Sequence, residues 1–168
     1  MRLYHGTDKF FEFPDLSKCR PFKDFGKGFY LSPDLAVAKR MAERCAMRSE
    51  QANAPMYVYV YDFDESGASG LAVRTFPSII NSEFALFVLA NRRGRINAAD
   101  HNRDNRYDIV SGPIADDKLG VLFRRFEDGE VSIEYLTENL KYRKLSLQYS
   151  FHTKRSLKLL SLLEVRRV

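Results

Sequence analysis

Two short stretches near the start of the chain carry residue types from which a ligand site can be built. The first is LYHGT, residues 3–7, in which His5 precedes a glycine, and the second is FGKGFYLSPD, residues 25–34, which contains Tyr30. Glycine lets another group approach the backbone closely, an aromatic ring stacks on a flat ligand, and histidine bonds to a hydroxyl as donor or acceptor. Together they predict a nucleotide cleft between two early strands. The alternative is that His5 and Tyr30 are ordinary strand residues, and spacing alone favours that alternative.

The other reactive side chains predict no metal or nucleophile site. The sequence contains no phosphate-binding loop, nucleophile elbow or zinc-helix motif. His101 lies among aspartates, a pattern that is typical of a solvated loop, and His152 is expected to bond to backbone at a strand end. The two cysteines, Cys19 and Cys45, match no metal or redox spacing. We therefore expect no metal, and a reducing cytosol is the simplest setting for the thiols.

Hydrophobic periodicity predicts an α+β fold in one domain over residues 1–168. Strands are expected at residues 2–5, 28–32, 56–63, 71–76, 107–112 and 145–153, with an edge strand at 162–168. Helices are expected after residue 33 and at residues 82–92, 116–126 and 131–140, with a last one from about residue 153. This order is not a regular alternation of strand and helix, which is why we predict α+β.

Three of these elements carry specific expectations. In the first helix Ser32 is predicted as the cap and Pro33 as the first helical residue. The apolar residues expected on one face of that helix are Leu35, Ala38, Met41, Ala42 and Cys45. In the helix at 82–92 the buried side should carry Phe84, Phe87 and Val88. In the late strand Gln148 should face a cleft, opposite to Leu145, Leu147, Tyr149 and Phe151.

Composition indicates a globular protein without a membrane span, but it does not identify a binding partner. The 168 residues carry a net charge of +5, and no apolar run approaches the length of a membrane span. A basic nucleic-acid-binding protein remains one alternative, but it would need exposed aromatics on a basic face, and the aromatics lie mainly at core-like positions. The basic stretch at residues 91–106 is interpreted as a solvated loop. We expect a cytoplasmic protein that does not associate with membranes.

The motif HGT followed by FGKGFYLSPDLAVAKRMA resembles the NAD-binding half of the ADP-ribosyltransferase superfamily. The branch it is similar to is that of the poly- and mono-ADP-ribose polymerases, which use a His-Tyr-Glu triad. YDIVSGPIADDK and LQYSFHT are similar to small bacterial proteins of that superfamily, encoded beside a partner as toxin–antitoxin pairs are. The resemblance implies a split antiparallel sheet, NAD as co-substrate, a protein or nucleic-acid acceptor, and a small antitoxin partner.

The resemblance also assigns roles to single residues. His5 matches the residue that bonds the adenosine ribose, Gly6 the one whose backbone holds the nicotinamide carboxamide, and Thr7 completes the motif. Tyr30 matches the ring that stacks on nicotinamide, and Gly28 lets the chain approach it. Two positions depart from the family pattern. The second stacking tyrosine falls at Met41, and the triad glutamate falls at Gln148.

The change at Gln148 bears on the chemistry. Cleavage of the nicotinamide–ribose bond passes through an oxocarbenium-like state that a carboxylate stabilises, and glutamine keeps a hydrogen bond but loses the charge. The implied activities are mono-ADP-ribosyl transfer, NAD hydrolysis, or NAD binding without catalysis. Glu134 and Glu138 lie on a predicted helix and receive no role. We expect Gln148→Ala to leave folding nearly unchanged, and Gln148→Glu to keep or raise NAD turnover.

Overall fold

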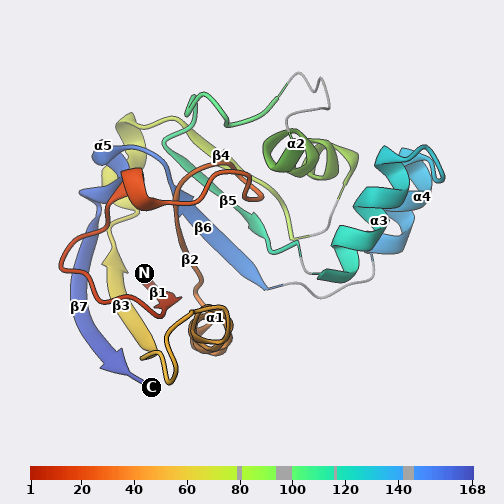
Figure 1. Ribbon diagram of the computed structural model, residues 1–168. Coiled ribbons are helices and arrows are strands. Elements are labelled where there is room, and N and C mark those ends of the chain that lie inside the picture. Colours follow the sequence, from red (N-terminus) through yellow and green to blue (C-terminus); the bar gives the residue numbers. More distant parts are fainter. Residues whose placement is uncertain (79–80, 94–99, 116, 142–145) are drawn as a thin grey trace.

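The strands form two small sheets (Figure 1), which one isolated backbone bridge between Tyr4 and Ser32 links. The computed structural model describes residues 1–78, 81–93, 100–115, 117–141 and 146–168. The first sheet is antiparallel, in the order β1 (Arg2–Thr7), β3 (Tyr57–Phe63) and β7 (Leu160–Arg167). The second has the order β2 (Phe29–Leu31), β6 (Leu147–Phe151), β5 (Ile109–Pro113) and β4 (Val73–Thr75). Because β4 pairs with β5 in parallel, this sheet is mixed rather than wholly antiparallel.

The helices lie outside the two sheets. The helical elements of the described residues are η1 (Leu16–Lys18), α1 (Leu35–Met47), η2 (Ser66–Gly70), α2 (Ser82–Arg93), α3 (Asp117–Glu127), α4 (Ile133–Lys141) and α5 (Lys154–Leu157). Helix α1 packs on β1 and β3, while α4 contacts both α2 and α3 (Figure 1). None of the helices in the described ranges combines the length and the apolar character of a membrane span.

Two hydrophobic clusters cover the two faces of the second sheet. The cluster between the sheets takes its large side chains from both of them: Leu3, Phe29, Leu31, Tyr59, Tyr61, Phe63, Ile109 and Phe151. The other cluster joins β5 to the helices, through Phe25, Phe76, Phe84, Phe87, Val88, Leu89, Val110, Phe123 and Leu136 among others. Because the second sheet contributes side chains to both clusters, strands and helices form one compact unit, and the predicted single domain of mixed α and β structure is confirmed at this level.

The start of α1 differs from the prediction. Asp34 is the N-cap, and its side chain accepts a hydrogen bond of 2.8 Å from the Ala36 N–H. Ser32 cannot cap the helix because its backbone is paired with Tyr4 and its hydroxyl donates to the Leu147 carbonyl at 2.8 Å. The prediction of a Ser32 cap with Pro33 inside the helix is therefore wrong by two residues.

The buried side predicted for α2 is confirmed, and the one predicted for α1 is confirmed in part. Phe84, Phe87 and Val88 of α2 are all buried as expected. In α1 only Ala38 and Ala42 are buried, whereas Met41 is 39% exposed. The larger side chain of Met41 lies at the margin of the contact because α1 approaches β1 so closely that alanine fills the space. Met41 as part of the packed face is therefore wrong.

Candidate functional site

The candidate site lies where β1 and β2 part. Tyr4 and Ser32 exchange two backbone hydrogen bonds, with N···O distances of 2.8 and 2.9 Å, and this bridge is isolated. Beyond it His5 Nδ1 lies 2.7 Å from the carbonyl oxygen of Tyr30. The His5 side chain therefore bonds to the Tyr30 carbonyl, which would bond to the Gly6 N–H if the antiparallel pairing continued. The two strands separate from this point on.

Gly6 faces the edge that this separation leaves open. Along an antiparallel strand, backbone N–H and C=O groups point to alternate sides residue by residue. Tyr4 bonds to Ser32 on one side, so Gly6, two residues later, directs its N–H and C=O to the same side. Gly6 is buried, and among the described residues none bonds to its backbone there. A buried peptide group in this situation offers a donor and an acceptor to a ligand.

The glycine at this position is also required by the packing of α1. A Cβ atom on Gly6 would lie 1.8 Å from the Ala38 carbonyl oxygen and 2.8 Å from the Ala42 nitrogen. The sequence interpretation gave this glycine one purpose, close approach of a ligand to the backbone. The structure adds another, because the backbone of a helix lies directly against it.

His5 is a neutral imidazole whose tautomer is fixed by its partner. Burial is the main reason why its pKa falls from 6.5 to about 4, the bond to the Tyr30 carbonyl acts against this fall, and the charge of Lys23 adds to it. Because a carbonyl oxygen only accepts, Nδ1 must carry the proton. Nε2 is then a hydrogen-bond acceptor, so His5 offers a hydroxyl an acceptor rather than a donor.

Tyr30 meets His5 through its backbone and not through its ring. The ring projects to the other side of β2, where its hydroxyl donates to the Gly26 carbonyl at 2.7 Å and accepts from the Phe25 N–H at 2.9 Å. Phe25 is stacked on the ring with centroids 6.3 Å apart. Burial is the main reason why the pKa of Tyr30 lies well above its ordinary value. The ring is thus a fixed wall of the interior, with Phe25 beside it.

Gly28 makes room for His152. A Cβ atom on Gly28 would lie 2.7 Å from Nδ1 and Cε1 of that imidazole. His152 Nδ1 donates to the Lys27 carbonyl at 2.9 Å, which confirms the predicted bond to backbone. Its Nε2 lies 2.8 Å from the Ser150 hydroxyl, and burial lowers its pKa from 6.5 to about 4.

These two histidines predict a loss of stability in mild acid. Both have a folded-state pKa of about 4 against 6.5 as the ordinary value, so the unfolded chain binds their protons first as the pH falls. Stability is therefore retained above about pH 6.5 and lost between pH 6.5 and pH 4, by about 3 kcal/mol for each histidine.

Urea unfolding at pH 7.0, 5.5 and 4.5 measures this loss. His5→Asn should reduce the slope of stability against pH by about half, whatever its effect on stability at pH 7. A urea midpoint of the parent protein that stays constant from pH 7.0 to pH 4.5 would contradict the assignment of both imidazoles.

Gln148 lies on the same face of the second sheet as Tyr30, in a buried polar cluster. Its Nε2 donates to Asp24 Oδ2 at 2.8 Å and to the Pro113 carbonyl at 3.1 Å. Asp24 also accepts from Arg92 Nε at 2.8 Å and from the Ala115 N–H at 3.1 Å. The carboxylate of Asp24, which precedes β2, thus connects three other parts of the chain: Arg92 of α2, Ala115 just after β5, and Gln148 of β6.

This cluster changes what was expected of Gln148. The residue is only 8% exposed, so the expectation that its amide packs against little is wrong, and we now expect Gln148→Ala to destabilise the protein. The reason is the carboxylate of Asp24, which the sequence interpretation did not identify. Asp24 and Arg92 are 68 residues apart, and no local pattern connects them with each other or with Gln148.

The remaining predicted site residues lie at the margin. Thr7 is buried, and its hydroxyl accepts from the Lys9 N–H at 3.2 Å, which forms the turn that leaves β1. Met41 is exposed on α1, and no described contact joins it to Tyr30. The structure therefore brings His5, Gly6 and the Tyr30 backbone together at one edge, and the Tyr30 ring with Gln148 on one face.

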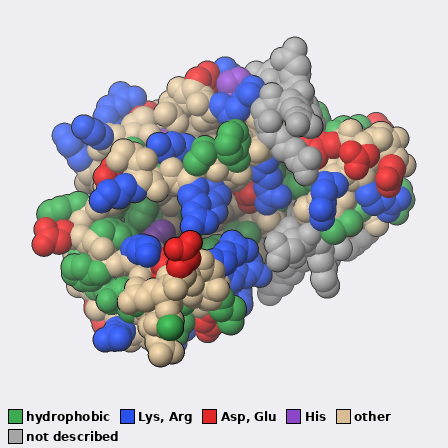
Figure 2. Space-filling view, in the orientation of Figure 1, with side chains coloured by type: hydrophobic (Ala, Val, Ile, Leu, Met, Phe, Trp, Pro, Cys, Tyr) green, Lys and Arg blue, Asp and Glu red, His purple; other side chains and the backbone are tan. Residues whose placement is uncertain are grey.

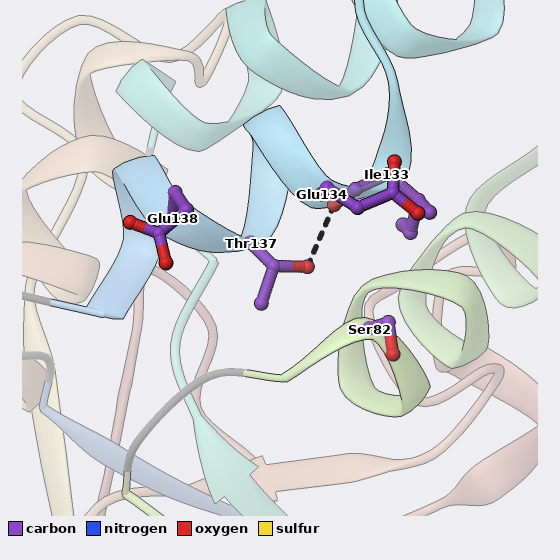
Figure 3. A pocket seen from close by; sticks show the side chains of 5 residues that line it. All are labelled: Ser82, Ile133, Glu134, Thr137 and Glu138. Atoms are coloured by element: carbon purple, nitrogen blue, oxygen red, sulfur yellow. Dashed lines mark hydrogen bonds between the residues drawn. The ribbon is translucent and has the colours of Figure 1, made fainter.

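A separate pocket lies between the start of α2 and one side of α4 (Figure 3). It has a volume of about 280 Å³ and is lined by Ser82, Ile133, Glu134, Thr137 and Glu138. Thr137 is held by its own helix, because its hydroxyl donates to the Ile133 carbonyl at 2.7 Å. None of the residues that line this pocket belongs to the site at β1 and β2, and we assign it no role.

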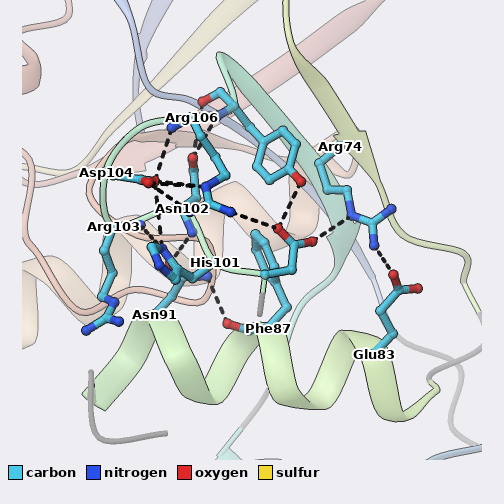
Figure 4. A network of polar contacts seen from close by, with 11 residues as sticks. Arg74, Glu83, Phe87, Asn91, His101, Asn102, Arg103, Asp104 and Arg106 are labelled. Atoms are coloured by element: carbon cyan, nitrogen blue, oxygen red, sulfur yellow. Dashed lines mark hydrogen bonds and ion pairs between the residues drawn. The ribbon is translucent and has the colours of Figure 1, made fainter. Parts of the chain in front are cut away.

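The loop before β5 is occupied by structural polar contacts (Figure 4). Asn102 accepts from the Tyr107 N–H at 2.9 Å and donates its own N–H to Asn91 at 2.8 Å, which fastens the loop to α2. His101 Nδ1 lies 3.7 Å from Asp104 Oδ1. Within the described ranges no cluster of His, Cys, Asp and Glu side chains has the arrangement of a metal site.

Comparison with known proteins gives a family but no activity. Residues 1–162 match the model of a family described as "Protein of unknown function (DUF3990)". Since this match spans nearly all of the 168 residues, the chain belongs to the DUF3990 family. No curated protein and no solved structure matches it.

Proposed function

We propose that the chain binds NAD where β1 and β2 part and transfers its ADP-ribose to a macromolecule, as a mono-ADP-ribosyltransferase-like toxin. The observation that carries the proposal is the open backbone edge of Gly6 beside the acceptor nitrogen of His5. A carboxamide has one donor and one acceptor group, which complement the N–H and C=O of one residue. A ribose hydroxyl complements an imidazole nitrogen that accepts. NAD carries both groups, and the family resemblance assigns them to the same two residues.

In the proposed reaction the bond between the nicotinamide nitrogen and the ribose C1′ breaks, and its electron pair leaves with nicotinamide. The acceptor then attacks C1′, which carries developing positive charge. Gly6 would orient the leaving group through its backbone, and His5 would fix the adenosine end through Nε2. Both groups are held by neighbours before ligand arrives, which reduces the cost of orientation.

Gln148 supports single, slow transfer rather than chain elongation. Both hydrogens of its Nε2 are directed at Asp24 and Pro113, so a ribose that reached Gln148 would meet only its amide oxygen. An amide oxygen carries a partial charge, and the nearby carboxylate of Asp24 is already balanced by Arg92 at 2.7 Å. The transition state would receive less electrostatic stabilisation than a free carboxylate gives. The resemblance further leads us to propose action in the cytoplasm and a small antitoxin as partner.

Calorimetry with NAD tests the proposal. The parent protein should bind NAD, and His5→Ala should weaken binding about fivefold, because one hydrogen bond of about 1 kcal/mol is lost. His101→Ala is the matched control, since His101 lies in the loop before β5, and it should bind NAD as the parent does.

NAD carrying a label on its adenosine end then identifies the reaction. Label on a macromolecule supports transfer, free labelled ADP-ribose indicates hydrolysis by water, and unchanged NAD indicates binding alone. The proposal fails if the parent protein gives no heat with NAD, or if His5→Ala and His101→Ala bind it equally well.

A further inference from the structure

The connection between β1 and β2 exposes large aromatic rings. Phe10, Phe13 and Phe22 are 64%, 79% and 66% exposed, although most phenylalanines of the described residues are buried. A lone exposed ring is common, but three in one connection form an unusual apolar surface. The nucleic-acid-binding alternative was set aside because the aromatics were expected mainly at core-like positions, and these three residues are exceptions to that pattern.

The backbone conformation of Phe22 gives no structural reason for a phenylalanine at this position. Its φ angle is 61°, in the left-handed region that a bulky residue rarely adopts. Glycine or asparagine would be favoured at such a position. Neither burial nor backbone preference accounts for a phenylalanine here. We therefore infer that the exposed ring serves to contact a ligand.

Positive charges lie between these rings and directly beside them in sequence. Residues 9–23, which we call the aromatic–basic segment, contain the four cations Lys9, Lys18, Arg20 and Lys23 and only two carboxylates. In its second half, residues 16–23, there are three cations and no acidic residue. Lysine and arginine side chains also gather across the middle of the face seen in Figure 2.

The segment lies beside the candidate NAD site. The charge of Lys23 contributes, after burial, to the lowered pKa of His5. Burial raises the pKa of the Cys45 thiol on α1, and the charges of Arg20 and Lys23 act against that rise. The geometry agrees, because the ring of Phe11 in this segment lies edge-on to His5 with ring centroids 5.9 Å apart. A polyanion bound along the segment would therefore pass next to His5.

We propose that the aromatic–basic segment binds single-stranded nucleic acid. Exposed rings stack on bases, each of which has an aromatic face, while lysine and arginine neutralise phosphates. A duplex hides the faces of its bases, so a single strand fits better. An acidic protein would match the cations but would leave the three rings without a partner.

The bound strand would also be the acceptor, a step that rests on the proposed function. A base nitrogen attacks C1′ of the nicotinamide ribose and forms a C–N bond, while the bond to nicotinamide breaks and its electron pair leaves with nicotinamide. The proton of the attacking nitrogen passes to water. The proposal thus narrows the acceptor to a base of a strand held beside His5.

Fluorescence anisotropy with labelled 15-mers of dT and of rU tests the binding step without NAD. We expect binding at low salt, with either oligonucleotide or with one of them. Phe22→Gly should weaken it five- to tenfold, because a stacked base is lost, while the melting temperature rises as the strain at φ 61° is relieved. A residue with a merely structural role would not give this combination. Arg20→Gln combined with Lys23→Gln should reduce the slope of log K against log salt by about 1.4.

Two controls use other exposed side chains. Tyr135 on α4 is 47% exposed, and Tyr135→Ala should leave affinity unchanged. Lys158 is exposed at the end of α5. Lys158→Gln should change the slope of log K against log salt less than the double substitution of Arg20 and Lys23 does. The proposal is overturned if neither 15-mer binds at low salt, or if Phe22→Gly binds like Tyr135→Ala. It is also overturned if polyglutamate competes as well as the oligonucleotide does, which would indicate a surface for an acidic protein.

These outcomes are independent of the NAD site. If calorimetry shows NAD binding and anisotropy shows no nucleic-acid binding, the surface proposal alone fails and the acceptor is a protein. If the oligonucleotide binds and NAD does not, the proposed function fails and the segment remains a nucleic-acid surface.

Discussion

Gly6→Ala should destabilise the protein by about 3 kcal/mol, which corresponds to a fall of roughly 6 to 12 °C in melting temperature. The added methyl group would lie 1.8 Å from the Ala38 carbonyl oxygen. That atom belongs to the backbone of α1, so the clash cannot be relieved by rotating a side chain. The helix would have to move away from β1, which exposes Ala38 and Ala42. Differential scanning calorimetry measures the change directly.

Gly120→Ala is the matched control for this substitution. Gly120 lies inside α3, and a Cβ atom there would meet nothing within 4 Å. The same chemical change should therefore stabilise the protein by about 1 kcal/mol, through helix propensity alone. If both variants changed the melting temperature in the same direction and by similar amounts, the close contact between β1 and α1 would be wrong.

Gln148→Glu should destabilise the protein by about 3 kcal/mol at pH 7, contrary to the expectation that it restores a useful carboxylate. The new oxygen would replace Nε2, which lies 2.8 Å from Asp24 Oδ2 and 3.1 Å from the Pro113 carbonyl. Two carboxylates so close cannot both remain ionised, and the folded-state pKa of one rises above its unfolded value. The penalty is therefore full above the raised pKa and shrinks as the pH falls through it.

A second substitution separates charge repulsion from packing. Asp24→Asn in the Gln148→Glu background again places an amide opposite a carboxylate, and it should recover about half of the lost stability. Recovery is incomplete because Arg92 and the Ala115 N–H also bond to Asp24. Urea unfolding of the parent, both single variants and the double variant gives the coupling energy. Additive effects at pH 7 would mean that the two side chains do not meet.

The sequence allowed prediction of those parts of the fold that local periodicity determines. The buried side of α2 follows from Phe84, Phe87 and Val88 at helical spacing, and β7 was predicted as an edge strand. The start of α1 was misplaced because the backbone of Ser32 bonds to Tyr4, a partner 28 residues earlier that no local rule includes.

The candidate site was predictable only in part. The positions of His5, Gly6 and Tyr30 followed from two short motifs, whereas the burial of Gln148 depends on Asp24, 124 residues away. Exposure of Phe22 was also beyond prediction, since a phenylalanine beside Phe25 in sequence gives no sign of which ring enters the core. Both errors concern contacts that are set by distant parts of the chain.

The separation between Asp24 and Gln148 has a consequence for synthesis on the ribosome. At about 5 to 20 residues per second, roughly 6 to 25 s pass between the translation of these two residues. During that time Asp24 has no amide from β6 to bond, and β2 lacks its ladder partner β6. The nascent chain carries the motifs of His5 and Tyr30 yet lacks the sheet that holds Tyr30 in place. If the proposed NAD site is correct, a growing chain should therefore not bind NAD before β6 has been made.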